Sequence, residues 1–190
     1  MPEPRPAKSI ADLLSCTDPV CHIRQLTAAD ETFCRSLFFE HRAAEFAPLG
    51  PSENVLHALL DQQFEAQRIG YARQFPDAEH FIVVHAGIDV GRVILSLQRS
   101  PPVLPEADAK QSQQGVTLHL IDIIIAAAAR RRGIGSDVID SLARAAHALG
   151  ATRFTLSVLQ TNDAARRLYE RLGFVTADDG VHVAMVRHLN

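Results

Sequence analysis

The chain has 190 residues, 47% of them hydrophobic, so it can bury one substantial core and is expected to form a single folded domain. Its formal net charge of −3 gives no general electrostatic basis for binding nucleic acid or an anionic membrane surface. No apolar run approaches the roughly 20 residues of a membrane span, and no basic start followed by an apolar segment suggests export. Three cysteines without Cys-x-x-Cys spacing indicate neither a disulfide framework nor a metal site, so a cytoplasmic protein is expected.

The N-terminal part predicts an extension, a strand and two helices. Residues 1–19 hold four prolines and are expected to form a flexible extension, with the folded domain covering residues 20–190. A short strand is predicted over 20–26, after which Thr27 can cap a first helix. Ser52 can cap a second, longer helix whose apolar residues keep helical spacing.

Two neighbouring strands and a loop are predicted next. Residues 81–86 and 90–97 are apolar and β-branched, and residues 87–89, Gly-Ile-Asp, suit the turn between them. Gly91, early in the second strand, permits a bulge or a close backbone contact. Residues 100–115, with three prolines, are expected to form a loop.

A strand, a glycine-containing turn and a helix are predicted between residues 116 and 149. Residues 116–125 form an apolar, β-branched run that is short enough to be a buried strand. Apolar residues recur at spacings of three and four from Ile134 to Leu149, and Gly150 stands where a left-handed residue commonly ends a helix. The turn between strand and helix contains Arg130, Arg131, Arg132, Gly133 and Gly135.

This turn has the chemistry of an anion site, and a diphosphate suits it best. The first N–H groups of a helix have no partner inside the helix, and the peptide dipoles add roughly half a positive charge there. Arginines offer fork-shaped donors to phosphate oxygens, and glycines let a ligand approach the main chain. The alternative is a surface arginine run before an ordinary helix.

The C-terminal part predicts a strand, a helix and a final strand. A strand is predicted over 154–159, and Asn162 can cap a helix that Gly173 ends. The last strand, 181–189, can pair with residues 174–177, and it offers an edge through which a homodimer could form.

Two segments resemble the signatures of the GNAT superfamily of acetyl-CoA-dependent N-acyltransferases. A dinucleotide fingerprint fails here because its third glycine is Val138, and a P-loop fails because no Gly-Lys-Ser/Thr triplet occurs. The turn instead resembles the Arg/Gln-x-x-Gly-x-Gly/Ala segment of that superfamily, with Arg130, Gly133 and Gly135. Residues 161–174 resemble its second signature, an Asn, two small residues and Leu-Tyr-x-x-x-Gly-Phe.

The resemblance covers residues 20–189 and implies both a fold and a reaction. The implied fold is α+β, with a mixed, mostly antiparallel sheet whose two middle strands splay apart to admit pantetheine. The implied reaction is direct transfer of an acetyl group from acetyl-CoA to a primary amine in a ternary complex. The implied contacts to coenzyme A are the backbone of Ile123 and Ile125, the side chain of Asn162, and Arg130, Arg131, Arg132, Gly133, Ile134, Gly135 and Ser136.

An alkyl ammonium has a pKa of about 10.4 and no lone pair, so this reaction needs a proton acceptor. His119 stands at the strand position where several family members place a catalytic glutamate, and an imidazole can accept a proton at cellular pH. The alternative is a packed, hydrogen-bonded histidine. Asp122 is the second candidate because a carboxylate in an apolar run is costly to bury without partners, although an arginine contact would explain it equally. Strand alternation puts the two on opposite faces unless a bulge lies between them.

Loss of the coenzyme A thiolate is eased by a proton donor, since the parent thiol has a pKa of about 8.5. Tyr169 matches the family tyrosine that takes this role, and a buried hydroxyl held by a carbonyl is the alternative. At Ala127 many relatives have proline, so this chain departs from the pattern there.

The acceptor is expected to be a small-molecule or peptide amine that the sequence does not name. The resemblance places the acceptor side on the first two helices, where Arg42, Gln67 and Tyr71 are among the polar residues. The alternative, a solvated helix face, would explain most of these residues. The rival function is a non-catalytic acyl-CoA-binding or regulatory module on the same fold.

Overall fold

The computed structural model describes residues 9–99 and 115–190, which form two compact units. The α1–α2 unit contains residues 18–96 and 121–135. The α3–α4 unit contains residues 9–17, 97–99, 115–120 and 136–190. The predicted loop over 100–115 lies, apart from Gly115, outside the described residues.

The strands hydrogen-bond in the order β1-β2-β3-β4-β5-β7-β6. The central strand β4 (Val116–Ile125) gives its first half to the α3–α4 unit and its second half to the α1–α2 unit. It runs parallel to β5, whereas the β1–β2, β2–β3, β5–β7 and β6–β7 pairs are antiparallel. The predicted α+β class with a mostly antiparallel sheet is therefore confirmed. The pairing of β4 with β5 runs from Val116 to Leu120, and the splay beyond that point stays a prediction.

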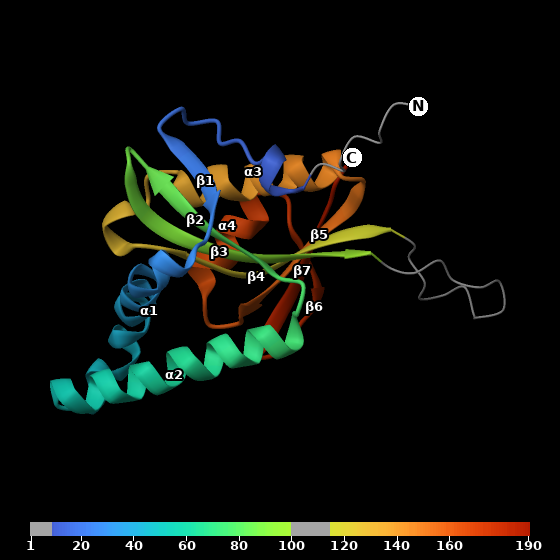
Figure 1. The fold of residues 1–190 in the computed structure, drawn as a ribbon. Coiled ribbons are helices and arrows are strands. Elements are labelled where there is room, and N and C mark those ends of the chain that lie inside the picture. Colours follow the sequence, from blue (N-terminus) through green and yellow to red (C-terminus); the bar gives the residue numbers. More distant parts are fainter. Residues whose placement is uncertain (1–8, 100–114) are drawn as a thin grey trace. The chain divides into compact units, whose positions relative to one another are not determined.

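In the α1–α2 unit two helices cover one face of a half-sheet (Figure 1). The strands are β1 (Cys21–Gln25), β2 (Glu79–His85) and β3 (Ile88–Arg99), and the helices are α1 (Glu31–Phe46) and α2 (Glu53–Gln74). The core joins side chains of α1, α2 and β2, among them Phe38, Phe64 and Ile82. The α1 start is fixed by a capping box between Thr27 and Asp30 in the short 3-10 turn that precedes it, as the sequence predicts. Ser52, in contrast, makes no side-chain cap to α2.

The hairpin between β2 and β3 is tighter than predicted. Ala86 and Gly87 both have positive φ, so they form the turn, and Ile88 already belongs to β3. A register shift at Val83/Val84 produces a bulge next to Gly91, as Gly91 suggested. A Cβ on Gly91 would lie 2.6 Å from the carbonyl oxygen of Ile124, so β3 and β4 approach too closely there for any other residue.

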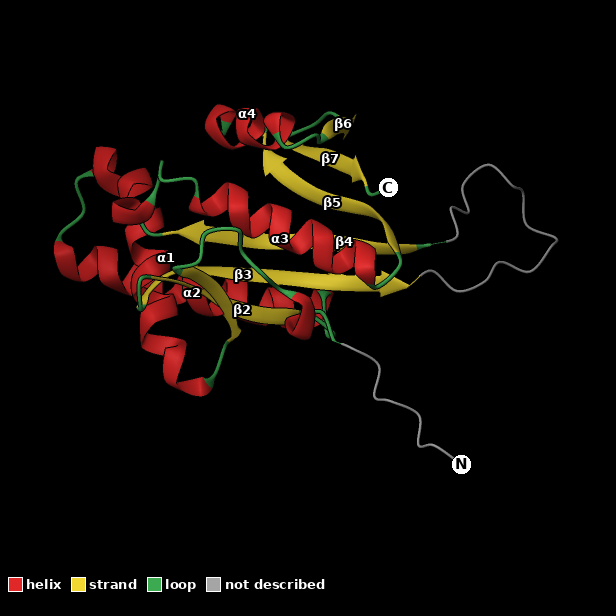
Figure 2. Cartoon of the chain, turned by 90° about the horizontal axis from the view of Figure 1, so that it is seen from above, coloured by secondary structure: helices red, strands yellow, loops and turns green. Residues whose placement is uncertain are grey.

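The α3–α4 unit packs two helices with the C-terminal strands. Its helices are α3 (Ile134–Ala148) and α4 (Asp163–Arg171), and its further strands are β5 (Ala151–Leu159), β6 (Val175–Asp178) and β7 (His182–His188). Strand β7 lies between β5 and β6 (Figure 2). The predicted pairing of the last strand with residues 174–177 is confirmed by β6, which pairs antiparallel with β7. The expectation that the last strand offers an open edge was wrong, because the short β6 covers it. A homodimer stays a prediction without that argument.

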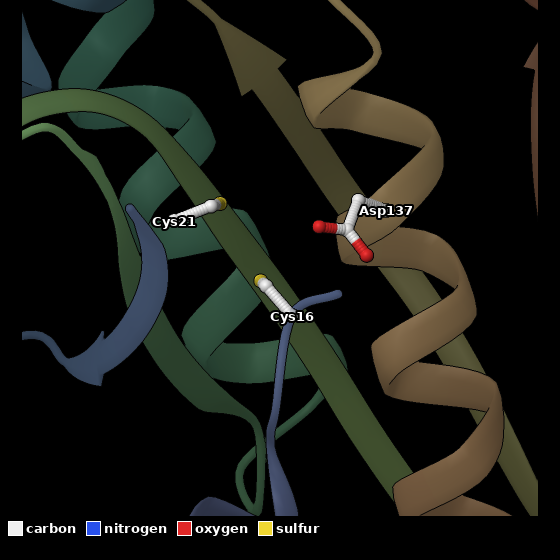
Figure 3. A group of neighbouring side chains, drawn as sticks. All are labelled: Cys16, Cys21 and Asp137. Atoms are coloured by element: carbon white, nitrogen blue, oxygen red, sulfur yellow. The ribbon is translucent and has the colours of Figure 1, made fainter. Parts of the chain in front are cut away.

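The N-terminal segment is anchored where it is described, rather than loose. The N–H of Ser15 donates to Ser141 Oγ at 2.8 Å and that of Thr17 to Asp137 Oδ1 at 2.7 Å, while Arg144 donates to the Ser15 carbonyl at 2.7 Å. Cys16 lies between these anchors, with its thiol beside Asp137 (Figure 3).

No helix within residues 9–99 or 115–190 combines the length and the apolar character that crossing a membrane requires.

Candidate cofactor and acceptor sites

The turn after β4 is held open by its own backbone. The N–H of Ala126 donates to the carbonyl of Val90 at 2.8 Å, which ends the strand, and a single 3-10 turn, Ala127–Ala129, follows. Arg131 (φ +59°) and Gly133 (φ +82°) then adopt the left-handed region, which turns the chain into α3. Nothing lies within 4 Å of the position a Cβ on Gly133 would take, so a ligand can reach the main chain there.

The arginines of this turn divide into one that supports the loop and two that do not. Arg130 Nε donates to the Ile125 carbonyl at 2.7 Å. Arg131 and Arg132 are exposed, and in the described part of the chain none of the three arginines forms an ion pair. Exposed guanidinium groups beside the N–H groups of a helix start fit the diphosphate that the sequence predicts.

Helix α1 also contributes to this turn. Glu40 accepts a hydrogen bond from the Ala127 N–H through Oε1 at 2.7 Å. A proline at position 127, as in many relatives, would have no N–H to donate. The departure from the family pattern therefore has a structural use in this chain. Sequence reasoning missed Glu40, and its place on an exposed helix face gave no signal.

A cavity of about 250 Å³ lies in the α1–α2 unit, between both helices and the half-sheet. Its walls include Leu26, Phe64 and Ile94, and its polar groups include Tyr71 and Arg92. Burial, and after it the negative charge of Asp122, raises the pKa of Tyr71 to about 12. The Tyr71 hydroxyl therefore stays protonated at any cellular pH and can act as a donor.

Arg92 is a buried cation at this cavity. It is only 5% exposed, and its Nη2 donates to Asp122 Oδ2 at 2.5 Å and to Gln67 Oε1 at 3.3 Å. Its Nε is shielded from solvent and finds no hydrogen-bond partner in the described ranges. An unsatisfied buried donor costs about 1–3 kcal/mol. The sequence left two explanations for Asp122, a catalytic base or a contact with an arginine. The structure contains the arginine contact, which Arg92 makes.

Sequence reasoning did not single out Arg92, although a signal existed. Arg92 interrupts the apolar run of one predicted strand, as Asp122 interrupts another. Opposite charges in two apolar strands predict that the strands are neighbours and that the charges meet.

His119 lies in the α3–α4 unit, hydrogen-bonded to a strand neighbour. Its Nδ1 lies 3.0 Å from Thr155 Oγ1, and that hydroxyl donates to the Leu118 carbonyl at 3.3 Å. Since the hydroxyl proton is used there, Nδ1–H is the donor and Nε2 carries the lone pair. Burial lowers the pKa of His119 below 6.5. The ring is therefore neutral at cellular pH. A bulge that would bring His119 and Asp122 to one side stays a prediction, because the β4–β5 irregularity lies at Val116/Thr117.

Asn162 and Tyr169 lie at the start and in the last part of α4. Asn162 Oδ1 accepts from the Ala165 N–H at 3.2 Å, which confirms the predicted cap. Tyr169 is 8% exposed, and its ring packs edge-on against Phe174 at 5.7 Å between centroids. Gly173 has φ +84° and ends the helix as predicted. Ser136, predicted to contact the cofactor, lies in the first turn of α3.

The open turn between β4 and α3, with its exposed arginines and its left-handed glycine, has the chemistry of the anion site that the sequence predicts. Residues 52–174 match the sequence model of the Acetyltransferase (GNAT) family, so the chain belongs to that family. Acetyl-CoA is the cofactor that this family uses, as the two signatures predict.

Solved structures share this fold at low sequence identity. The PaiA N-acetyltransferase of Thermoplasma acidophilum, in complex with coenzyme A, is 14% identical, with 88% of this chain and 98% of that chain covered and a TM-score of 0.62. The yncA protein of Salmonella typhimurium, with its cofactor acetyl-CoA, is 18% identical (90% and 95% covered, TM-score 0.53). An acetyltransferase from Thermus thermophilus is 20% identical (90% and 97% covered, TM-score 0.56). At these identities the likeness establishes the fold alone.

Proposed function

We propose that this protein is an N-acetyltransferase that transfers the acetyl group of acetyl-CoA directly to a primary amine in a ternary complex. The observation that carries the proposal is the turn between β4 and α3. It combines two exposed arginines with a left-handed glycine that has open space above it. Family membership supplies the reaction class.

Acetyl-CoA supplies the activated acyl group, and the chain's residues bind, orient and move protons. Arg131, Arg132 and the first N–H groups of α3 hold the diphosphate, and the main chain of Ile123 and Ile125 pairs with the pantetheine amides. His119 Nε2 takes the proton from the incoming ammonium, since the ring is neutral and its lone pair lies on that atom. Tyr169 gives a proton to the departing thiolate.

Asp122 takes a supporting role in this scheme. It is paired with a buried guanidinium, so its charge is committed to Arg92. The resemblance places the acceptor side on the first two helices, and the cavity that Arg92 lines lies between these helices and the half-sheet. We therefore take this cavity as the acceptor side of the α1–α2 unit. We also propose a cytoplasmic location, where the thiols of Cys16, Cys21 and Cys34, which form no disulfide, would stay reduced.

Calorimetric titration with coenzyme A tests the carrying observation. The Arg131→Gln/Arg132→Gln double variant should bind coenzyme A about 10- to 100-fold more weakly, because each charged hydrogen bond contributes about 1.5–3 kcal/mol at most and exposed ones contribute less. Arg73→Gln, which removes an exposed arginine at the end of α2, is the matched control and should bind normally. Absence of binding to the unaltered protein would end the proposal.

The rival function, a non-catalytic acyl-CoA-binding module, predicts the same calorimetric result, namely binding of coenzyme A at this turn. Thiol release separates the two. An enzyme produces coenzyme A faster than background hydrolysis when a suitable amine is added, whereas a binding module does not.

A further inference from the structure

The cavity of the α1–α2 unit has a buried floor and an exposed mouth. The lining residues that form the floor are each 5% exposed or less, and they are Cys34, Phe64, Arg92 and Ile94. The lining residues of the mouth are exposed and include Glu31 and Arg68. Three of the four floor residues are apolar or behave as small apolar groups, so a ligand that reaches the floor meets mostly carbon and sulfur atoms.

Each charged side chain that lines the cavity already has a partner of opposite charge within the α1–α2 unit. The pairs are Arg92 with Asp122 at 2.5 Å, Arg68 with Glu65 at 2.8 Å, and Glu31 with Arg35 at 3.6 Å. The floor therefore offers no uncompensated charge to a ligand. Moving an ionic group from water onto such a floor is costly, because no counter-ion waits there for it.

The other titratable groups that line the cavity are uncharged at cellular pH. Burial raises the pKa of the Cys34 thiol. Burial, and after it the charge of Asp122, raises the pKa of Tyr71 to about 12. Removal of the His80 ring from part of the solvent lowers its pKa. These three side chains therefore give a ligand no ionic attraction of either sign.

The volume of the cavity limits the size of its occupant. At about 250 Å³ it lies below the roughly 300–1,000 Å³ of pockets for drug-sized ligands. An apolar cavity of roughly 150 Å³ already holds a benzene molecule. The cavity therefore has room for one aromatic ring or a short alkyl chain.

We infer that this floor binds the apolar body of the acetyl acceptor, and that the acceptor is a small primary amine whose carbon skeleton carries no second charge. The inference rests on the proposed function and names its substrate class. An alkyl chain or a phenyl ring leaves water when it packs on Phe64 and Ile94, while the ammonium group keeps its hydration at the mouth. A diamine or an amino acid with a distant carboxylate would place its second charge on the floor.

Calorimetry on the full chain without acetyl-CoA measures this selection with three amines of similar length. Pentylamine ends in a methyl group, 1,4-diaminobutane in a second ammonium and 4-aminobutyrate in a carboxylate. Pentylamine should bind about 10- to 100-fold more tightly than either charged counterpart. Affinity for one of the charged amines that equals or exceeds the affinity for pentylamine would overturn the inference, and so would no binding by pentylamine.

A series of alkylamines from propylamine to octylamine measures the depth of the floor. Each added methylene should tighten binding about fourfold while it is buried, and the gain should stop once the cavity is full. An affinity that does not change along the series would overturn the inference.

Substitutions at Ile94 assign the preference to the floor. Ile94→Val and Ile94→Thr create side chains of nearly the same shape, one ending in a methyl group where the other has a hydroxyl. Pentylamine should bind Ile94→Thr about three- to tenfold more weakly than Ile94→Val, because burying a hydroxyl against an alkyl chain is unfavourable. Binding of 1,4-diaminobutane should differ by less than about twofold between the two variants. Equal affinities for pentylamine would overturn the inference.

Ile94→Val alone keeps the test decisive if Ile94→Thr does not fold. It deepens the floor by one methyl group, so the gain along the alkylamine series should stop one methylene later than in the unaltered protein. An unchanged end point would overturn the inference. Ile69, which is 45% exposed on α2 and does not line the cavity, supplies the matched control pair Ile69→Val and Ile69→Thr. These two variants should bind pentylamine equally.

A parallel assay of acetyl-CoA consumption separates this inference from the proposed function. Consumption that is as fast with 1,4-diaminobutane or 4-aminobutyrate as with pentylamine would keep the function and overturn the substrate class. Binding of pentylamine that depends on Ile94, in a protein that does not bind acetyl-CoA, would overturn the function and keep the ligand of the cavity.

Discussion

At the scale of single residues, Tyr169 is held by its ring, so its hydroxyl can be tested alone. Tyr169→Phe keeps the edge-on contact with Phe174 and should leave coenzyme A affinity within about threefold. Turnover should fall about 100-fold or more, as expected when a general acid is removed. Steady-state kinetics and calorimetry on the same preparation check this. Equal losses of turnover and affinity would show that the tyrosine is structural.

His119 makes a prediction about pH. Burial lowers its pKa below the ordinary value for histidine, so the ring is predominantly neutral at pH 7 and becomes charged at lower pH. As a base it should therefore give kcat/KM an acid limb that lies at lower pH than the limb of an exposed histidine. His119→Gln, which keeps a side-chain donor for Thr155, should lose that limb and about 100-fold in rate. An acid limb that survives the substitution would assign the base elsewhere.

At the scale of elements, helix α1 supports the turn between β4 and α3 through Glu40. Glu40→Ala removes the acceptor of the Ala127 N–H and should weaken coenzyme A binding about three- to tenfold, because the turn loses a charge-assisted hydrogen bond. Glu40→Gln removes the charge but keeps a side-chain oxygen, so it should bind at least as tightly as the unaltered protein. The ratio of the two dissociation constants, measured by calorimetry, isolates the hydrogen bond from the charge.

Glu45→Ala is the control on the same helix, because Glu45 is exposed and pairs with Arg42 rather than with the turn. It should leave coenzyme A affinity unchanged. Equal dissociation constants for Glu40→Ala and Glu40→Gln would mean that Glu40 acts only through its charge.

At the scale of the whole molecule, coenzyme A should stabilise the folded chain by binding it in preference to the unfolded one. A concentration of 100 times the dissociation constant should raise the free energy of unfolding by about 2.7 kcal/mol. Thermal unfolding with and without coenzyme A measures this. The Arg131→Gln/Arg132→Gln variant, with its 10- to 100-fold weaker binding, should keep only about 0.4–1.4 kcal/mol of the gain at the same concentration, and an undiminished gain would place the binding site elsewhere.

Much of the fold was readable from local patterns. Apolar alternation predicts strand β5, and the Thr27–Asp30 spacing predicts the cap before α1. Gly150 and Gly173 mark the ends of two helices, and both adopt the positive φ that such positions require. Each of these depends on neighbours within a few residues, which the sequence contains. The β2–β3 turn was misplaced because Ala86, a residue that seldom takes positive φ, shares the turn with Gly87.

The sequence by itself determined the turn between β4 and α3, because its arginines, glycines and helix start are consecutive along the chain. Tertiary structure alone decided the partners of the charged groups: Arg92 meets Asp122 from a strand thirty residues away, and Glu40 reaches Ala127 across eighty-seven residues. It also decided that β6, rather than the last strand, forms the edge of the sheet. The physical reason is that such pairings depend on strand order and on how helices pack, and these are set by the burial of the whole core.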